Sequence, residues 1–307
     1  MPRILLGNCY DNASYKILKA CVPTGYELFQ LSEATQAALL EAIPEAEYLI
    51  ASGRLKIDVG VIARAKKLRL VVRTGVGLDS IDLPALEAAG IPLRVNAGVN
   101  AESVAEHTLL LILAALRRLP EADRKVKAGE WPKRALGVAS HELRGKKVFV
   151  AGLGNIGRRV VQLLGPFGCK VAGSDSLDRA NLPVDFFDSD IVTLHCPLTQ
   201  STERLIDKDV VARLRPGCII VNTARGGLVD EEALAEGLRS GCIGFACLDV
   251  RASEPSRDPA PFAGLDNVIL TSHIAGITYE SFESMMTGAV KNIVEFEEEY
   301  DSSCCEN

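Results

Sequence analysis

The sequence predicts an α/β protein of two domains, each built on a parallel β-sheet. Three observations support this prediction. The 307 residues allow about two domains of ordinary size. Short apolar runs alternate with stretches of helical periodicity through about the first 95 residues. A pattern of strand, glycine turn, helix, strand and acid then runs from Val148 to Asp175, which indicates a second sheet of βαβ type.

The first domain is expected to have a flavodoxin-like fold. Helical spacing at Ala34 to Ala42 and at Val59 to Ala65 separates its strands. The expected strands are five apolar runs: Ile4 to Leu6, Glu27 to Phe29, Tyr48 to Ala51, Leu70 to Val72 and Leu93 to Val95. Because about 95 residues of this pattern precede the glycine motif, the nucleotide-binding domain is expected to be inserted into, or to follow, a first domain that holds substrate. We assign residues 1–98 and 279–307 to the substrate (catalytic) domain and residues 99–278 to the nucleotide-binding domain.

A long helix is predicted from Asn100 to Leu119, between the two domains. Asn100 is a suitable N-cap, acidic residues come early, arginines come late, and Pro120 is expected to end the helix. The run Leu109 to Leu116 is apolar on every side, which a surface helix does not tolerate. We therefore expect this helix to be buried between domains or between subunits, and the protein to form a homo-oligomer.

The pattern from Val148 to Asp175 matches the dinucleotide-binding unit of a Rossmann fold. Gly152 permits the tight turn, Gly154 lets the backbone approach the pyrophosphate, and Gly157 lets the helix pack on the strand. The free N–H groups at the start of the helix suit a phosphate. The motif therefore predicts a larger, Rossmann-type second domain.

The acid at the end of the second strand indicates which dinucleotide binds. Asp175 lies 18 residues after Gly157, close to the ~20 expected for the acid that bonds the ribose hydroxyls. A carboxylate would repel the 2′-phosphate of NADP, so NAD is the expected cofactor. Arg179 lies close enough in the sequence to keep NADP as an alternative.

Four more strands are expected after Asp175, each followed by a polar loop. They are Ile191 to Leu194, Ile219 to Val221, Gly244 to Leu248 and Val268 to Leu270. Loops at the carboxyl ends of parallel strands are where an open sheet binds its ligand. A last helix is predicted from Glu280 to Tyr300, with an acidic end that is expected to face solvent.

The composition argues against several classes of partner. With 48% hydrophobic and 24% charged residues and a net charge of −6, the chain offers no global basic field for nucleic acid or an anionic membrane. Its longest apolar run, Leu109 to Leu116, is far shorter than the ~20 residues of a membrane span. The nine cysteines show no metal-ligand spacing, and the N-terminus lacks the features of a signal peptide. We expect a cytoplasmic protein without a metal, in which Cys304 and Cys305 lie in an exposed tail without a role.

The loops after the later strands resemble those of the D-2-hydroxyacid dehydrogenase family. The motifs that carry this resemblance are His195-Cys-Pro-Leu-Thr199, Asn222-Thr-Ala-Arg-Gly-Gly-Leu-Val-Asp230, Asp249-Val-Arg-Ala-Ser-Glu-Pro255 and Thr271-Ser-His-Ile-Ala-Gly276. Two earlier motifs, Arg73-Thr-Gly-Val-Gly-Leu-Asp-Ser-Ile-Asp82 and Val104-Ala-Glu-His-Thr108, are similar to other signatures of that family. The resemblance runs from about residue 45 to about residue 285.

The resemblance implies an NAD-dependent oxidoreductase with Arg225, Glu254 and His273 as its catalytic residues. Delivery of a proton to a carbonyl oxygen suits His273, since an imidazole titrates near neutral pH. Glu254 would hold the imidazole by a hydrogen bond and fix its tautomer. Arg225 offers a rigid fork of donors to the carboxylate and keto oxygens of a 2-keto acid.

The glycine motif and the resemblance together define the expected binding residues. The cofactor residues are Gly152, Gly154, Asn155, Ile156, Gly157, Asp175, His195, Pro197, Thr202, Thr223, Ala224, Asp249, His273 and Gly276. Among these, His195 is expected beside the cofactor without a proton role, and Asp249 is expected to bond the nicotinamide carboxamide. The expected substrate residues are Ser52, Gly53, Arg54, Val76, Gly77 and Arg225. Within this set, Arg54 is the candidate for an anionic tail of the substrate.

One departure from the family concerns the adenine side of the pocket. Only 14 residues separate Asp175 from Asp190, fewer than the family usually has, so a strand–helix step is expected to be missing. The substrate also stays open: the candidates are 3-phosphoglycerate, as in the phosphoglycerate dehydrogenase-like enzymes, glyoxylate, hydroxypyruvate or another small 2-keto acid. We expect a homodimeric dehydrogenase. The alternative is an NAD-sensing protein with little turnover, similar to the corepressors that share this fold.

Overall fold

The computed structural model describes residues 1–75 and 77–305, in two compact units. Unit 1 comprises Met1–Asn100 and Thr278–Asn307, and unit 2 comprises Ala101–Ile277. Within the described residues, no helix combines the length and the apolar character needed to cross a membrane. Each unit has its own sheet and its own core, so the two are described separately.

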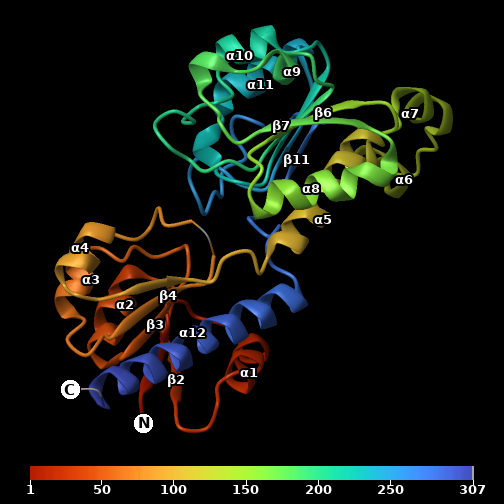
Figure 1. Ribbon diagram of the computed structural model, residues 1–307. Coiled ribbons are helices and arrows are strands. Elements are labelled where there is room, and N and C mark those ends of the chain that lie inside the picture. The colour runs from red at the N-terminus through yellow and green to blue at the C-terminus, as the bar shows by residue number, and fades with distance from the viewer. Residues whose placement is uncertain (76, 306–307) are drawn as a thin grey trace. The chain divides into compact units, whose positions relative to one another are not determined.

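Unit 1 contains a five-stranded parallel sheet (Figure 1). Its strands are β1 (Arg3–Leu6), β2 (Glu27–Gln30), β3 (Tyr48–Ala51), β4 (Leu70–Arg73) and β5 (Leu93–Val95). They lie in the order β2-β1-β3-β4-β5, which is the flavodoxin-like order. The predicted α/β class and the parallel sheet of this unit are confirmed.

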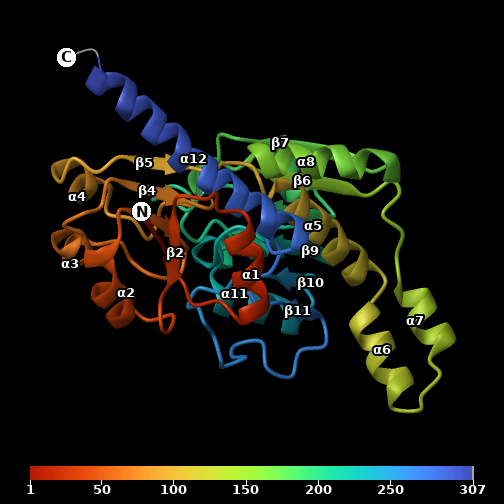
Figure 2. The ribbon, with the colours of Figure 1, turned by 90° about the horizontal axis from the view of Figure 1, so that it is seen from below.

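Helices cover both faces of this sheet, because adjacent residues of a strand point to opposite faces. Leu5 and Leu49 face a core made with α2 (Gln36–Ala42), α3 (Val59–Arg64) and α4 (Leu83–Ala88). Leu6 and Ile50 face the other core, made with α1 (Asn12–Ala20) and the long α12 (Tyr279–Cys305), which runs along the sheet in Figure 2. A short 3₁₀ turn, η1 (Ile43–Glu45), follows α2.

Aspartates begin three of these helices. The side chains of Asp11, Asp58 and Asp82 each accept a backbone N–H from the first turn of α1, α3 and α4. Such N-caps satisfy donors that the helix itself leaves unpaired. The sequence analysis named α2 and α3 but not α1 or α4.

Unit 2 contains a six-stranded parallel sheet in the order β11-β10-β9-β8-β6-β7. Its strands are β6 (Lys147–Ala151), β7 (Lys170–Ser174), β8 (Ile191–Leu194), β9 (Cys218–Asn222), β10 (Ile243–Leu248) and β11 (Val268–Leu270). The usual Rossmann order, 3-2-1-4-5-6, has one more strand beyond β7. Here β7 is the edge strand, and only η3 (Arg179–Asn181) and α9 (Val184–Phe187) occupy the chain before β8. The predicted loss of a strand–helix step is confirmed.

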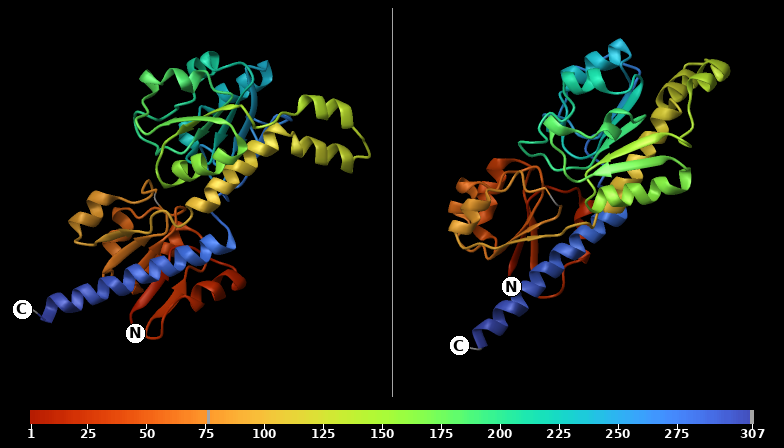
Figure 3. Two further views of the ribbon diagram at one scale, coloured as in Figure 1. Left: turned by 45° about the vertical axis from the view of Figure 1, so that its right-hand side comes forward. Right: turned by 45° about the horizontal axis from the view of Figure 1, so that its top comes forward.

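The helices of unit 2 also cover both faces of its sheet. One core joins the sheet to α5 (Ala101–Leu116) and α8 (Asn155–Leu164). The other joins it to α9, α10 (Lys208–Arg213) and α11 (Glu231–Ser240). Two further helices, α6 (Leu119–Lys127) and α7 (Lys133–Ala139), project from this unit (Figure 3).

The predicted long helix differs from the observed one in two respects. It ends at Leu116, where Arg118 takes a left-handed backbone conformation with φ 50°. Pro120 does not end this helix but lies in the first turn of α6, where its missing N–H costs nothing. Most of the apolar run is buried inside unit 2, against α8 and the sheet, and packing within the unit is enough to bury it. Leu110 is the exception, at 54% exposed.

Candidate active site

The glycine turn joins the end of β6 to the start of α8. Gly152 has φ +100°, and a Cβ there would lie 2.6 Å from the backbone nitrogen of Cys196. A Cβ on Gly157 would lie 1.8 Å from the carbonyl oxygen of Gly152, so α8 starts hard against the turn. Only glycine fits these two positions.

Gly154 differs from these two glycines, because the space beside its Cα is free of other protein atoms. It is the N-cap of α8, it makes no side-chain cap hydrogen bond, and a Cβ there would meet nothing within 4 Å. The first N–H groups of α8 are therefore available to an anion approaching the turn. This open backbone at the start of a helix fits a pyrophosphate.

The acidic residue after β7 is fixed beside the glycine turn. An oxygen of the exposed Asp175 side chain accepts a hydrogen bond from the backbone N–H of Leu153. Arg179 is held elsewhere: its guanidinium lies 3.7 Å from a carboxylate oxygen of Asp207, and its backbone N–H donates to Ser201. A carboxylate without an arginine directed to it fits the ribose of NAD better than the phosphate of NADP.

His195 follows β8 and is partly buried, with its Nδ1 atom hidden from solvent. Its Nε2 lies 2.9 Å from the Thr193 hydroxyl, and its Nδ1 has no hydrogen-bond partner within the described part of the chain. Burial lowers the pKa of His195 to about 3, so the ring is neutral at physiological pH. The Thr202 hydroxyl donates to the Pro197 carbonyl at 2.7 Å and so shapes the loop that follows His195.

Arg225 lies on the loop after β9, and the buried Asn222 shapes that loop. The Asn222 side chain accepts from the N–H of Ala224 at 3.0 Å and donates to the carbonyl of Arg225 at 2.8 Å. The guanidinium of Arg225 donates to the Ala224 carbonyl at 2.7 Å and is partly exposed. This role of Asn222 in shaping the loop is not predictable from the sequence, because an asparagine that bonds the backbone has no distinctive sequence pattern.

Glu254 and His273 form a pair across two loops. Nδ1 of His273 lies 2.6 Å from a carboxylate oxygen of Glu254, and the ring is half-exposed. Burial would raise the pKa of Glu254, but hydrogen bonds from His273 and from the backbone N–H of Arg251 outweigh it, so the pKa lies below its ordinary value. The ionised carboxylate can only accept, so Nδ1 carries the proton and Nε2 points away from Glu254.

Asp249, the residue expected to bond the nicotinamide carboxamide, follows β10. Its side chain is fully buried, and its two oxygens accept from the N–H groups of Ile274 and Ala275 and from the Thr271 hydroxyl. The Asp249 carbonyl also accepts from the N–H of His273, which has a left-handed φ of 58°. Asp249 therefore holds the loop of His273 in a conformation that a histidine rarely adopts.

The other predicted cofactor residues occupy the same edge of the unit 2 sheet, at the carboxyl ends of its strands. They are Asn155 and Ile156 at the start of α8, Pro197 after β8, Thr223 and Ala224 after β9, and Gly276 after β11. The Thr223 hydroxyl is buried and lies 3.1 Å from that of Thr108 in α5. Within the described residues, no group of three or more His, Cys, Asp or Glu side chains could hold a metal ion.

Four of the predicted substrate residues, Ser52, Gly53, Arg54 and Gly77, follow β3 and β4 in unit 1. The Ser52 hydroxyl donates to the Gly7 carbonyl at 2.8 Å, and Arg54 is exposed. Val76 lies outside the described residues. Gly77 is fixed by the buried Arg73, whose Nε donates to its carbonyl at 2.7 Å.

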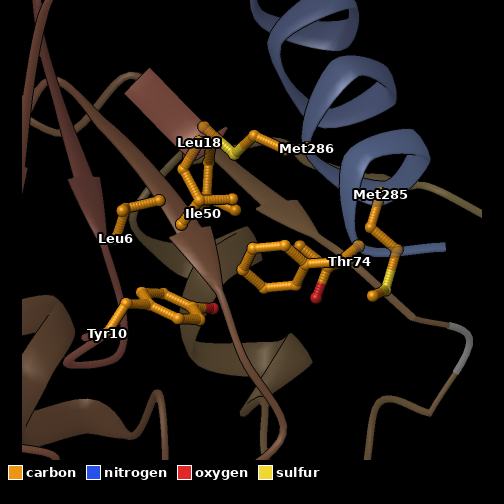
Figure 4. Close-up of a pocket in the computed structure, with 8 residues that line it drawn as sticks. Leu6, Tyr10, Leu18, Ile50, Thr74, Met285 and Met286 are labelled. Carbon is orange, nitrogen blue, oxygen red and sulfur yellow. The ribbon is translucent and has the colours of Figure 1, made fainter. Parts of the chain in front are cut away.

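An apolar pocket lies at the same end of the unit 1 sheet, where the sequence analysis expected none (Figure 4). It is lined by Leu6, Tyr10, Leu18, Ile50, Thr74, Phe282, Met285 and Met286. Its walls come from three strand ends, from α1 and from α12, which are far apart in the sequence. Tyr10 lies close enough to Arg54 for the two to interact electrostatically.

The fold and the site place the chain in the class of dinucleotide-binding α/β proteins with a histidine–carboxylate pair. Comparison with known proteins narrows this class. Residues 109–275 match the family described as "D-isomer specific 2-hydroxyacid dehydrogenase, NAD binding domain". The chain belongs to the D-isomer specific 2-hydroxyacid dehydrogenase family, and its cofactor is NAD.

Individual relatives agree with this assignment. The chain is 41% identical to a D-3-phosphoglycerate dehydrogenase of Mycobacterium leprae over 83% of its own length and 50% of that protein. It is 39% identical to a hydroxypyruvate reductase of Thermotoga maritima over 79% of its own length and 82% of that protein. The crystal structure of the TT0316 protein from Thermus thermophilus superposes with a TM-score of 0.84 at 32% identity, covering 95% of this chain and 96% of that one. The chain spans about half the length of the phosphoglycerate dehydrogenases that it matches.

Proposed function

We propose that this protein reduces a small 2-keto acid to the D-2-hydroxy acid with NADH, or catalyses the reverse oxidation. The observation that supports this most strongly is the hydrogen bond between His273 and Glu254, 2.6 Å long, on loops at the NAD-binding edge of the unit 2 sheet. Unit 2 is the NAD-binding domain of the proposal, and unit 1 is its substrate domain.

His273 is the acid in the reduction. The hydride for the carbonyl carbon would come from NADH held at the glycine turn. Because Nδ1 of His273 is hydrogen-bonded to Glu254, Nε2 is the atom that delivers a proton to the carbonyl oxygen. The Glu254 carboxylate stabilises the imidazolium before that transfer and keeps the ring oriented during it.

Arg225 binds the substrate. Its planar guanidinium offers paired donors to the carboxylate and keto oxygens of a 2-keto acid, which orients the carbonyl and stabilises the charge that develops on it. The Asn222 hydrogen bonds hold the backbone of this arginine, which limits the positions that its guanidinium can take. His195 takes no proton in this scheme, because burial lowers its pKa to about 3.

The substrate tail belongs to unit 1 in this proposal. The backbone at Val76 and Gly77 binds the carboxylate, and Ser52, Gly53 and Arg54 face the rest of the molecule. Arg54 is exposed and forms no ion pair with any residue that the structure describes, so it is available to an anionic tail. The names of relatives include substrates with such a tail and without one. The first to test are therefore 3-phosphoglycerate with NAD, and hydroxypyruvate and glyoxylate with NADH.

A homodimer is part of the same proposal. Neither α6 nor α7 contains a buried residue, yet the segment carries apolar side chains that are largely exposed, namely Leu119, Val126, Trp131 and Val138. Apolar surface of this kind on a projecting segment is typical of a protein interface. We propose a second copy of the chain as its cover, in a cytoplasmic enzyme.

The test is oxidation of NADH in the presence of a panel of 2-keto acids. We expect turnover of at least one of them, and a kcat about 100 to 10,000 times lower in His273→Ala, which lacks the general acid. His141→Ala is the matched control, because His141 lies exposed in unit 2 outside the site, and it should behave as wild type. NADH binding without turnover of any 2-keto acid would contradict the proposal and favour an NAD-sensing protein instead.

A further inference from the structure

We propose that the ion pair between Glu231 and Arg251 positions Glu254, and through it His273, for proton transfer. The proposal rests on the proposed function, since it assigns two positioning residues to that reaction. Neither side chain needs to contact substrate or cofactor for this role. Both act through the backbone of the loop that carries Glu254.

The pair has the geometry of a strong and specific contact. Nε and Nη2 of Arg251 lie 3.0 and 2.9 Å from the two carboxylate oxygens of Glu231, which is a bidentate arrangement. The side chains are only 12% and 15% exposed, so water screens their attraction weakly. Glu231 also accepts the backbone N–H of Ala252 at 2.8 Å, so it holds the loop directly.

Arg251 holds the far end of the same loop. Its Nη2 donates to the carbonyl of Ala260 at 2.7 Å, and its guanidinium lies over the ring of the buried Phe262, 5.1 Å from the ring centre. Residues 252 and 260 are therefore both tied to the ion pair, and Glu254 lies between them. The backbone N–H of Arg251 completes the arrangement by donating to Glu254 at 2.8 Å.

The ion pair also joins the Glu254 loop to the loop of Arg225. A Cβ on Gly226, the residue after Arg225, would lie 2.0 Å from the carbonyl carbon and oxygen of Arg251, so the two loops touch through their backbones. Glu231 lies in the first turn of α11, which begins directly after the Arg225 loop. One buried contact thus fixes the relative places of the two loops that carry Arg225 and Glu254.

A largely buried ion pair is weak evidence for added stability, because the desolvation of both ions offsets their attraction. Its geometric effect is stronger, since a bidentate guanidinium fixes both distance and orientation. A shift of about 1 Å in a catalytic group can cost a rate factor of about 100. We therefore expect substitutions of the pair to disturb His273 more than they disturb the fold.

The first test measures the tautomer of the His273 ring by NMR of protein labelled with ¹⁵N-histidine, which has only four histidines to assign. In wild type we expect neutral His273 to carry its proton on Nδ1, as the bond to Glu254 requires. In Arg251→Gln and Glu231→Gln we expect the proton to move substantially to Nε2, as in Glu254→Gln. Arg251→Lys is a milder change, because lysine keeps the positive charge but lacks the two parallel donors of the guanidinium. In this variant we expect part of the His273 population to carry its proton on Nε2.

Two controls match these variants in charge and chemistry. Arg124→Gln breaks the exposed pair of Arg124 with Asp266, and Glu236→Gln removes an exposed carboxylate from the same helix as Glu231. Both should keep the wild-type tautomer. An Nδ1-protonated His273 in Arg251→Gln, Arg251→Lys and Glu231→Gln alike would overturn the proposal.

The second test is a double-mutant cycle on kcat at saturating NADH. We expect Arg251→Gln to lower kcat about tenfold in the wild-type background and less than twofold when Glu254 is already glutamine. Equal losses in both backgrounds would show that the pair does not act through Glu254 and would contradict the proposal. NADH affinity, measured by fluorescence, should stay within about twofold in every variant, because the pair does not touch the nucleotide turn.

The two tests separate this proposal from the proposed function. If wild type turns over no 2-keto acid, the dehydrogenase activity fails, while the tautomer of His273 still decides whether the ion pair positions it. If turnover is present and the tautomer does not respond to the variants, the activity stands and the positioning role fails.

Discussion

Two histidines of unit 2 differ in their surroundings, and the difference assigns their roles. His273 is half-exposed and hydrogen-bonded to a carboxylate, whereas His195 is partly buried beside a threonine hydroxyl. A histidine that transfers protons needs contact with substrate and a partner that stabilises its charge. Of the two, only His273 has such a partner, in Glu254, which favours it as the proposed acid. The lowered pKa of His195 bears instead on stability.

We expect His195 to weaken the native state as the pH falls. In the unfolded chain an imidazole takes up a proton near pH 6.5, whereas burial keeps the pKa of His195 at about 3 in the folded chain. Between these values the unfolded state binds one more proton, so the free energy of unfolding falls by up to about 1.4 kcal/mol per pH unit on acidification. This contribution should be absent from His195→Gln.

Urea unfolding of wild type and His195→Gln at several values between pH 7 and pH 4.5 measures this effect. The stability of wild type relative to the variant should decrease steadily toward the acidic end. His141→Gln serves as the control, because His141 is exposed, and its curve should run parallel to that of wild type. A difference between wild type and His195→Gln that does not change with pH would contradict the assignment.

At the residue scale, the sequence indicated the reactive groups better than the groups that hold them. Arg225, Glu254 and His273 lie in recognisable motifs, and the structure brings Glu254 and His273 together. The engagement of Arg179 with Asp207 could not be predicted, because the two are separated by a whole strand and its loops. The burial of the Asp249 side chain could not be predicted either, because a loop that folds back over a carboxylate has no periodicity to detect.

At the scale of elements, the turn between β6 and α8 separates the needs of the fold from those of the ligand. Gly152 and Gly157 are fixed by backbone contacts of the protein itself. Gly154 has open space where a Cβ would stand and an ordinary φ of −68°. A methyl group at that position meets no protein atom, but it would stand where the pyrophosphate approaches the helix.

Alanine substitutions at these glycines therefore have different expected effects. Gly154→Ala should leave the melting temperature within about 2 °C of wild type and weaken NADH binding at least about tenfold. Gly152→Ala should lower both the melting temperature and the affinity for NADH, because its Cβ would overlap the loop of Cys196 and its φ is positive. Calorimetry and NADH fluorescence titration measure the two quantities. Unchanged NADH affinity in Gly154→Ala would show that the cofactor does not approach this position.

The elements themselves were partly predictable. The strands of both sheets and the shortened segment after Asp175 follow from apolar runs and spacing, and the structure confirms them. The break between α5 and α6 was not predicted, because a proline is equally consistent with the end of one helix and the first turn of the next. The left-handed Arg118 decides between these possibilities, and its conformation depends on tertiary contacts.

For the whole molecule, the sequence predicted two parallel α/β sheets correctly, since the pattern of strands and helices determines that class. The apolar helix α5 packs within its own unit, so the surface proposed for the dimer is that of the projecting helices α6 and α7. Trp131 is 80% exposed and Val138 is 85% exposed. Exposed apolar side chains gathered on one projecting segment favour the dimer proposed above.

We expect wild type to be a dimer at micromolar concentration and the double variant Trp131→Ser/Val138→Asp to be a monomer, because a buried unpaired carboxylate opposes association. Light scattering after size-exclusion chromatography measures the mass directly. The control is Val184→Asp, since Val184 is 81% exposed in unit 2 but outside α6 and α7. A monomeric wild type, or a dimer that survives both substitutions, would contradict the dimer proposed through this segment.

The fate of the hydride tests the central claim most directly. NADH that carries deuterium at the transferred position is mixed with the enzyme and hydroxypyruvate, and the product is analysed by mass spectrometry and chiral chromatography. We predict one deuterium at C2 of D-glycerate, formed by wild type and at a rate about 100 to 10,000 times lower by His273→Ala. Formation of L-glycerate, or bound NADH that transfers no deuterium to this or any other 2-keto acid, would contradict the account.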